Sequence, residues 1–217
     1  MRIACRWIAA AAAVIALAPL SDARAAFVPI SQPDAAYVSG TNLISFSDPD
    51  FFTPSSISDG TQTVNFDIPM VALTTPATWA SWGSPPNTES ATPRVLWTNG
   101  FTSATLTFAN STTFGFELEP NTSVPSSLTA EFFNGMVSLG SITHSVDGNG
   151  GARLFAASTT TGSFDRVVVT GTDDFALAQV RYAESTRAVP EPASAVLFGL
   201  GVVGLVGLRW RARRLLS

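Results

Sequence analysis

Two neighbouring runs of sequence, "ATLTFAN" (residues 104–110) and "TTFGFELEP" (residues 112–120), decide the fold class. In both runs every second residue is apolar, which places apolar side chains on one face of a strand and the remaining ones on the other. The apolar positions are Ala104, Leu106, Phe108, Phe114, Phe116 and Leu118. Glu117 and Glu119 share the opposite, outward face of the second run. The pattern predicts antiparallel strands that bury one face and expose the other.

The same alternation continues along the chain between residues 42 and 182, at intervals of roughly ten residues. Turn signals such as Asn134-Gly135 and Thr170-Gly171 close the runs. The further runs are "SLTAEFF", "MVSLGSIT", "ARLFAA", "DRVVVT" and "DFALAQVRY". Helical periodicity is confined to the two ends. We therefore predict an all-β domain of about eight to ten strands, a two-sheet antiparallel sandwich of the jelly-roll or Greek-key type.

One stretch departs from this pattern. Residues 69–93 contain five prolines and few alternating positions, and a loop of this length inside a compact domain usually has a function or a structure of its own. Trp79 and Trp82 lie in it. Exposed indoles stack on sugar rings, which would make the pair a glycan-binding site, but the same two residues could instead anchor the loop to the core. The sequence leaves both interpretations open.

The charge of the central region limits its partners. Residues 26–188 contain five arginines, no lysine and fourteen acidic residues, which leaves a net charge of −9. Such a surface repels phosphate backbones and anionic lipids, so nucleic-acid binding is not expected. The one cysteine, Cys5, lies near the N-terminus, so the central region has no thiol for a disulfide or a metal.

Few side chains in the central region suggest catalysis. His144 is the only histidine, which excludes a site built from several histidines, and we interpret it as a surface residue at a strand end. A glycoside hydrolase needs two carboxyl groups, for which Glu117, Glu119 and Glu131 are the candidates. Acids that alternate with apolar residues are also what solubility alone produces. We therefore predict no catalytic residues and no enzymatic activity.

Asp173 and Asp174 are the one candidate for a metal site. Adjacent acids before a strand could contribute oxygens to a calcium ion at a sheet edge. The alternative is a turn in which aspartate accepts hydrogen bonds from backbone N–H groups. Two adjacent acids are a weak signal, so the sequence predicts no required cofactor and leaves calcium as the single candidate.

The N-terminus has the pattern of a secretory signal peptide. A short basic segment precedes an uncharged apolar run at residues 7–20, and Ala23-Arg24-Ala25 follows. Signal peptidase cuts after such a small-x-small sequence, and the run is short for a membrane span. We predict a signal peptide at residues 1–25, which removes Cys5 from the exported chain.

The C-terminus combines three features in a fixed order. Val189-Pro190-Glu191-Pro192 is followed by an uncharged, glycine-rich run at residues 193–208. Four arginines follow this run, namely Arg209, Arg211, Arg213 and Arg214. Sixteen residues of helix span about 24 Å, slightly less than a hydrocarbon core, and the positive-inside rule keeps the arginines in the cytoplasm. We predict a transmembrane helix with the β-domain on the outer side.

Taken together, residues 189–217 resemble the PEP-CTERM sorting signal of exopolysaccharide-producing Gram-negative bacteria, with a motif at 189–194, a helix at 193–208 and an arginine-rich tail at 209–217. The same type of segment is also known as the C-terminal part of ice-binding proteins. Residues 114–183 are similar to β-domains that many PEP-CTERM proteins carry. The resemblance implies that Pro190, Glu191 and Pro192 are recognised by an exosortase, a membrane protease that removes the anchor.

These expectations give three segments: a signal peptide (1–25), an extracytoplasmic β-domain (26–188) and a sorting signal (189–217). The implied partners are signal peptidase, an exosortase, the inner membrane for a limited time, and exopolysaccharide. The expected function is that of a non-catalytic protein of the cell surface or extracellular matrix. The alternative is a secreted carbohydrate-binding module that uses Trp79 and Trp82, with calcium as an aid.

Overall fold

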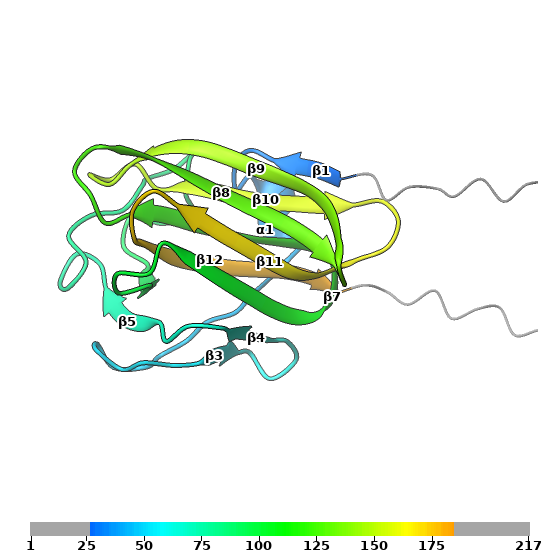
Figure 1. The fold of residues 1–217 in the computed structure, drawn as a ribbon, viewed down its shortest axis with the longest axis horizontal. Coiled ribbons are helices and arrows are strands. Elements are labelled where there is room, and N and C mark those ends of the chain that lie inside the picture. The colour runs from blue at the N-terminus through cyan, green and yellow to red at the C-terminus, as the bar shows by residue number, and fades with distance from the viewer. Residues whose placement is uncertain (1–26, 185–217) are drawn as a thin grey trace, which may run out of the picture.

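The computed structural model describes residues 27–184 (Figure 1). The predicted signal peptide, the PEP-CTERM motif, the transmembrane helix and the arginine-rich tail lie outside the described residues. Within residues 27–184, no helix has the length and apolar character needed to cross a membrane.

The described chain is mostly antiparallel β-sheet with almost no helix, which confirms the predicted all-β class. One helix of five residues, α1 (Ala35–Ser39), is present, and Asp34 caps it by accepting a hydrogen bond from the Tyr37 N–H. The strands are β1 (Phe27–Ile30), β2 (Asn42–Leu43), β3 (Ser56–Ser58), β4 (Thr63–Phe66), β5 (Val71–Thr74), β6 (Arg94–Trp97), β7 (Ser103–Pro120), β8 (Pro125–Asn134), β9 (Val137–Asp147), β10 (Arg153–Thr159), β11 (Phe164–Gly171) and β12 (Phe175–Glu184). The predicted number of strands was too low, because runs of two to four residues such as β2 and β3 are too short to show an alternating pattern.

Strand β7 organises the fold. The two runs that predicted separate strands form one strand of 18 residues. Its first half, up to Ser111, pairs with β11 on one side and β4 on the other, whereas its second half pairs with β12 and β10. The hydrogen-bonded network therefore divides at β7 into two layers, with strand orders β3-β4-β7-β11-β8-β9 and β5-β6-β12-β7-β10-β1. Strand β2 extends the second layer beside β12.

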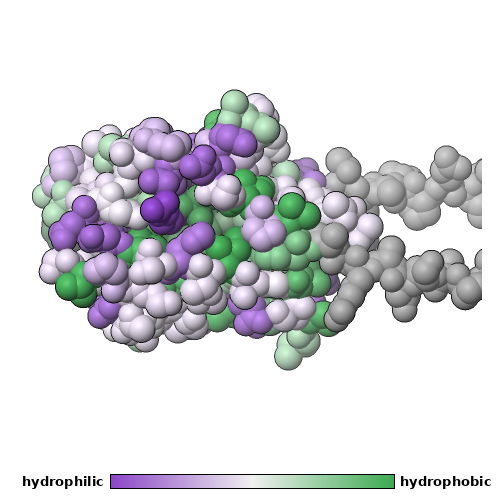
Figure 2. Space-filling view, turned by 90° about the horizontal axis from the view of Figure 1, so that it is seen from above, coloured by the Kyte–Doolittle hydropathy of each residue, from purple (hydrophilic) through white to green (hydrophobic). Residues whose placement is uncertain are grey.

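The main hydrophobic core lies between these layers. The predicted inward positions of β7, including Leu106, Phe114 and Leu118, are fully buried in it. Rings from opposite layers meet there: Phe27 of β1 lies 5.5 Å from Phe132 of β8. His144 of β9 is half-buried, with its ring 4.9 Å from that of Phe155 on β10, so it is not the surface residue that we predicted. Figure 2 shows hydrophilic and apolar residues side by side on the outer surface seen from above.

The second layer is buried on its outer face as well. A separate apolar cluster on that face contains Trp79 and Trp82 from the loop between β5 and β6. Its other members are Val71, Leu73, Val95, Ala152, Ala176 and Ala178. Because this loop, here called the tryptophan loop (residues 75–93), covers the sheet, strands β5, β6 and β12 have buried side chains on both faces. The same cover lies over the second half of β7, where the outward-facing Glu117 and Glu119 are buried, whereas the outward positions of its first half, such as Thr107, are exposed.

Candidate functional site

Two glutamates form an unusual pair beneath the tryptophan loop. Glu117 and Glu119 are next-but-one neighbours on β7, so their side chains leave the same face about 7 Å apart. Both are completely buried. The alternating pattern predicts an exposed face for both residues, and this prediction is wrong because the tryptophan loop covers that face.

Glu117 is held by donors from the loop. The indole Nε1–H of Trp82 donates to its carboxylate at 2.8 Å, and the backbone N–H of Glu89 donates at 2.6 Å. Burial raises the pKa of Glu117 to about 7, because removal from water penalises the charged form, and these two hydrogen bonds offset only part of that effect. Such a carboxyl group changes its charge near neutral pH.

Glu119 is held in a similar way. Its carboxylate accepts hydrogen bonds from the Gly150 N–H at 2.7 Å, the Ser81 hydroxyl at 3.2 Å and the Trp79 indole N–H at 3.4 Å. Burial is again the main cause of a pKa raised to about 7. The residue therefore connects the tryptophan loop to the turn between β9 and β10.

A buried ion pair fixes the far end of the same loop. Arg181 of β12 donates to both carboxylate oxygens of Glu89, at 2.6 and 2.9 Å. It also donates to the carbonyl oxygens of Val38 and Thr41, at 3.2 and 3.1 Å. Burial raises the pKa of the nearby Tyr37 hydroxyl, and the charge of Glu89 adds to that effect. The loop, the segment after α1 and strand β12 thus meet at one guanidinium group.

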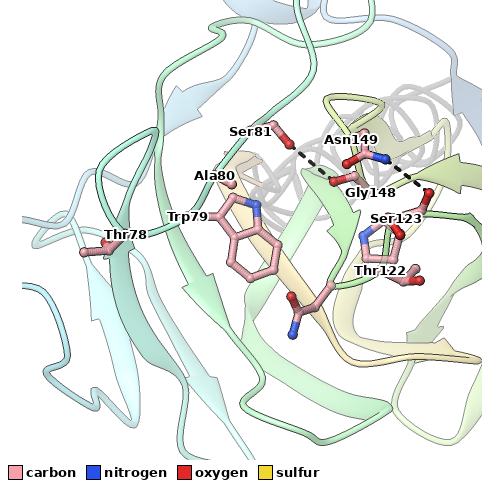
Figure 3. Close-up of a pocket in the computed structure, with 10 residues that line it drawn as sticks. Thr78, Trp79, Ala80, Ser81, Thr122, Ser123, Gly148 and Asn149 are labelled. Carbon is pink, nitrogen blue, oxygen red and sulfur yellow. Dashed lines mark hydrogen bonds between the residues drawn. The ribbon is translucent and has the colours of Figure 1, made fainter.

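Beside Glu119 the surface opens into a pocket of about 440 Å³ (Figure 3). Three segments form it: Thr78 to Ser81 from the tryptophan loop, Pro120 to Ser123 from the end of β7 and the turn after it, and Gly148 with Asn149 after β9. The Ser81 hydroxyl donates to Gly148 O at 3.3 Å, and Asn149 Nδ2 donates to Ser123 O at 3.1 Å, so hydrogen bonds cross between the walls.

Trp79 and Trp82 serve as anchors in this structure. Their side chains are only 7% and 5% exposed, and both indole N–H groups point to buried carboxylates. Of the two interpretations of this pair, glycan binding or anchoring of the loop, the positions of the side chains fit the anchoring one. A platform of two exposed indoles for sugar stacking is not formed, because the tryptophan loop turns its indoles toward the sheet.

The three carboxylates considered for hydrolysis do not converge. Glu131 lies on β8 in the other layer, where its carboxylate accepts a hydrogen bond from Ser138 at 2.5 Å. Glu117 and Glu119 stand side by side under the tryptophan loop rather than across an open cleft. The absence of enzymatic activity stays a prediction.

Asp174 occupies a turn. Its carboxylate accepts hydrogen bonds from Trp97 Nε1 at 2.6 Å, from the Gly100 N–H at 3.1 Å and from Asn121 Nδ2 at 3.2 Å. The neighbouring Asp173 accepts one from the Thr172 hydroxyl at 3.2 Å. Over residues 27–184, no three histidine, cysteine or acidic side chains gather as metal ligands would. Asp174 thus satisfies local donors, as the turn alternative proposed.

Sequence reasoning missed the Glu89–Arg181 pair and the pocket. Glu89 and Arg181 are 92 positions apart, and the pocket combines segments that follow three different strands. Neither arrangement leaves a local signal. The five prolines at residues 69–93 were the only indication that this loop has a structure of its own.

The C-terminal segment matches a known protein family. A family model described as the PEP-CTERM protein-sorting motif matches residues 188–214, which confirms the resemblance of the C-terminus. No curated protein matches the chain.

Solved structures similar to the chain include a family 6 carbohydrate-binding module (19% identity, 52% of this chain and 87% of that one, TM-score 0.29). A second is CsCBM6-3 from Clostridium stercorarium in complex with cellobiose (14% identity, 52% and 93%, TM-score 0.28). A third is a family 11 module from Clostridium thermocellum in complex with a mixed-linked tetrasaccharide (9% identity, 67% and 96%, TM-score 0.29). At TM-scores this low, the likeness carries no argument about ligands.

Proposed function

Because residues 188–214 are a PEP-CTERM protein-sorting motif, we propose that this protein is exported and then processed by an exosortase-type enzyme. In this proposal the chain is the substrate, and the catalytic groups belong to the processing enzyme. Signal peptidase first removes residues 1–25 after Ala25. The β-domain is then held outside a Gram-negative inner membrane until the anchor is cut off, and it ends at the cell surface or in the extracellular matrix.

The physical chemistry of the C-terminus supports the steps of membrane anchoring and cleavage. Pro190 and Pro192 suit a recognition segment that has to stay out of the helix, because proline lacks the N–H that a helix needs and disfavours helix in the residue before it. The uncharged run at 193–208 suits lipid, and the four arginines after it resist transfer to the outer side. Cleavage near Pro190-Glu191-Pro192 would free the β-domain from the membrane.

For the β-domain itself we propose a structural role in the matrix, without catalysis. Its two buried faces and its hydrogen-bonded carboxylates support a stable module that contains no cysteine. The alternative, a carbohydrate-binding module built on Trp79 and Trp82 with calcium near Asp173, has less support, because both indoles are buried and Asp174 is occupied by three donors.

The sorting proposal is tested by replacing Pro190, Glu191 and Pro192 with alanine in a host that has an exosortase. We expect the variant to stay in the membrane fraction at a mass that includes residues 193–217, because the enzyme no longer recognises its substrate. The matched control replaces Ser185, Thr186 and Arg187 with alanine and should be processed like the parent. Processing of both variants at the same rate would contradict the proposal.

A further inference from the structure

The pocket beside Glu119 has the construction of a ligand site. It lies where three segments of the chain meet (Figure 3). Gly148 permits this meeting, since a Cβ atom at that position would lie 1.8 Å from Thr122 O and 2.5 Å from Pro120 O. The close approach brings the Asn149 side chain to Ser123 O. The approach of two walls is therefore fixed by a backbone contact at Gly148, and side-chain hydrogen bonds hold the walls together.

Glu119 does not line the pocket, but it holds together two of the segments that do. Its carboxylate binds Trp79 and Ser81 in one wall, and Gly150 beside the other. Burying a carboxylate costs free energy, whereas burying an apolar residue at the same position would not. Several hydrogen bonds offset part of that cost. An arrangement of this kind serves to hold loops in one geometry, and preorganised walls are what a binding site requires.

The lining identifies the chemistry of the ligand. The lining consists of hydroxyl and amide groups, and none of the ten lining residues is charged. Thr78, Ser81, Asn121 and Asn149 also make hydrogen bonds within the domain, which fixes the direction of their remaining donors and acceptors. The polar side chains are Thr78, Ser81, Asn121, Thr122, Ser123 and Asn149. Trp79 and Pro120 add apolar surface. Groups of this kind complement a sugar, which presents hydroxyls at its rim and C–H groups on its faces. A volume of about 440 Å³ lies within the range of small-molecule sites.

The negative charge of the domain disfavours acidic sugars as ligands. Residues 27–184 contain four arginines and fourteen acidic residues, a net charge of −10. A uronic acid or a phosphorylated sugar would be repelled, and the pocket provides no cation to compensate. We propose that this pocket binds a neutral sugar unit of an extracellular polysaccharide. The inference rests on the proposed function, because export is what would bring the domain to such a polymer.

The test uses the full-length chain in an amine-oxide detergent, since detergents with a sugar headgroup would compete with the probes for the pocket. Isothermal titration measures binding of tetrasaccharides from β-glucan, mannan, xylan and galactan, with polygalacturonate tetrasaccharide as the acidic probe. We expect at least one neutral probe to bind with a Kd below about 1 mM, and the acidic probe to bind at least about tenfold more weakly.

Two variants locate the site. Ala80 lines the pocket and is exposed, so Ala80→Trp should fill it and weaken binding by about tenfold or more. Ala77→Trp, an exposed position in the same loop outside the pocket, is the matched control and should stay within about twofold of the parent. Replacing Thr122 by Val together with Ser123 by Ala removes two lining hydroxyls with little change in volume, and should weaken binding by about fivefold or more.

Three results would overturn the inference: no heat signal with any neutral probe at millimolar concentration, equal affinity for the acidic probe, or equal binding by Ala80→Trp and Ala77→Trp. Circular dichroism shows whether each variant is folded, and the double hydroxyl variant replaces Ala80→Trp if the latter is not. The purified chain binds or fails to bind regardless of its export. A titration without heat signal therefore contradicts the sugar-binding proposal and leaves the sorting proposal intact. If the chain binds sugar normally but is not processed in the host, the sorting proposal fails and the sugar-binding proposal stands.

Discussion

The indole N–H of Trp82 donates a hydrogen bond of 2.8 Å to the carboxylate of Glu117, across 35 positions of sequence and in a completely buried setting. Trp79 makes the corresponding bond to Glu119 at 3.4 Å. Tryptophans three apart in the loop thus match glutamates two apart on the strand. The tryptophan loop is attached to the sheet by specific polar contacts in addition to its apolar packing.

Removing the Trp82 donor should destabilise the domain. Trp82→Phe keeps an aromatic ring but leaves Glu117 with one donor fewer, so we expect the free energy of unfolding to fall by about 2–3 kcal/mol. Trp97→Phe is the matched control: it also removes a bond to a carboxylate, but Asp174 keeps two further donors, and the loss should be about 1 kcal/mol. Urea unfolding followed by circular dichroism measures both. Equal losses in the two variants would show that the buried bond to Glu117 stabilises the domain no more than the bond from Trp97 to Asp174 does.

Stability should fall as the pH rises through neutrality. The pKa of Glu117 is about 7 in the folded protein against an ordinary 4.5. Between these values the folded state binds more protons than the unfolded state, so this contribution is complete below about pH 4.5 and is lost as the pH passes 7. Its size is about 3 kcal/mol, and Glu119 acts in the same direction.

The variant Glu117→Gln isolates this effect. Burial lowers the pKa of His144, and the charge of Arg153 adds to that effect. The unfolded chain therefore binds more protons at this residue than the folded one, so the His144 contribution raises the stability as the pH rises toward about 6.5, opposite to Glu117. His144 is the same in parent and variant, so its contribution cancels in the comparison. We expect the difference in unfolding free energy between pH 5 and pH 8 to be smaller in Glu117→Gln than in the parent. An unchanged difference would mean that Glu117 does not titrate in this range.

Breaking the buried ion pair between Arg181 and Glu89 should cost more than breaking a partly exposed one. Arg181→Met leaves the Glu89 carboxylate without its partner, and we expect a loss of about 3–5 kcal/mol. In the double variant with Glu89→Gln, part of that loss should return, because no unpaired charge is buried. The control is Arg94→Met, which breaks a pair with Asp50 whose side chains are 31% and 26% exposed and also removes hydrogen bonds to Thr74 and Asp48; its loss should be about 1–2 kcal/mol. Chemical denaturation of the four proteins tests this order.

The close contact at Gly148 makes a further prediction. Gly148→Ala would place a Cβ atom against Thr122 O, so the turn must shift, and we expect a loss of about 1–3 kcal/mol together with weaker sugar binding. Asn149→Ala is the neighbouring control. It removes one exposed hydrogen bond to Ser123 O and should cost less than about 1 kcal/mol. Thermal unfolding compares the two, and a harmless Gly148→Ala would show that the contact between the segments is loose.

Much of the fold followed from local patterns. Alternation at Leu106, Phe114 and Leu118 identified residues that are fully buried, because a strand sends successive side chains to opposite faces whatever surrounds it. The sorting motif could be identified in the same way, since it consists of a continuous segment, residues 188–214, whose order and composition carry the signal.

The sequence by itself determined the strand class, one buried face of β7 and the identity of the C-terminal motif. Only the tertiary structure decided that Glu117 and Glu119 are buried, that Glu89 meets Arg181, and that three separate segments enclose a pocket. The physical reason is that alternation records which side chains share a face. What covers that face depends on contacts between segments far apart along the chain, and those contacts form only when the two layers and the tryptophan loop come together.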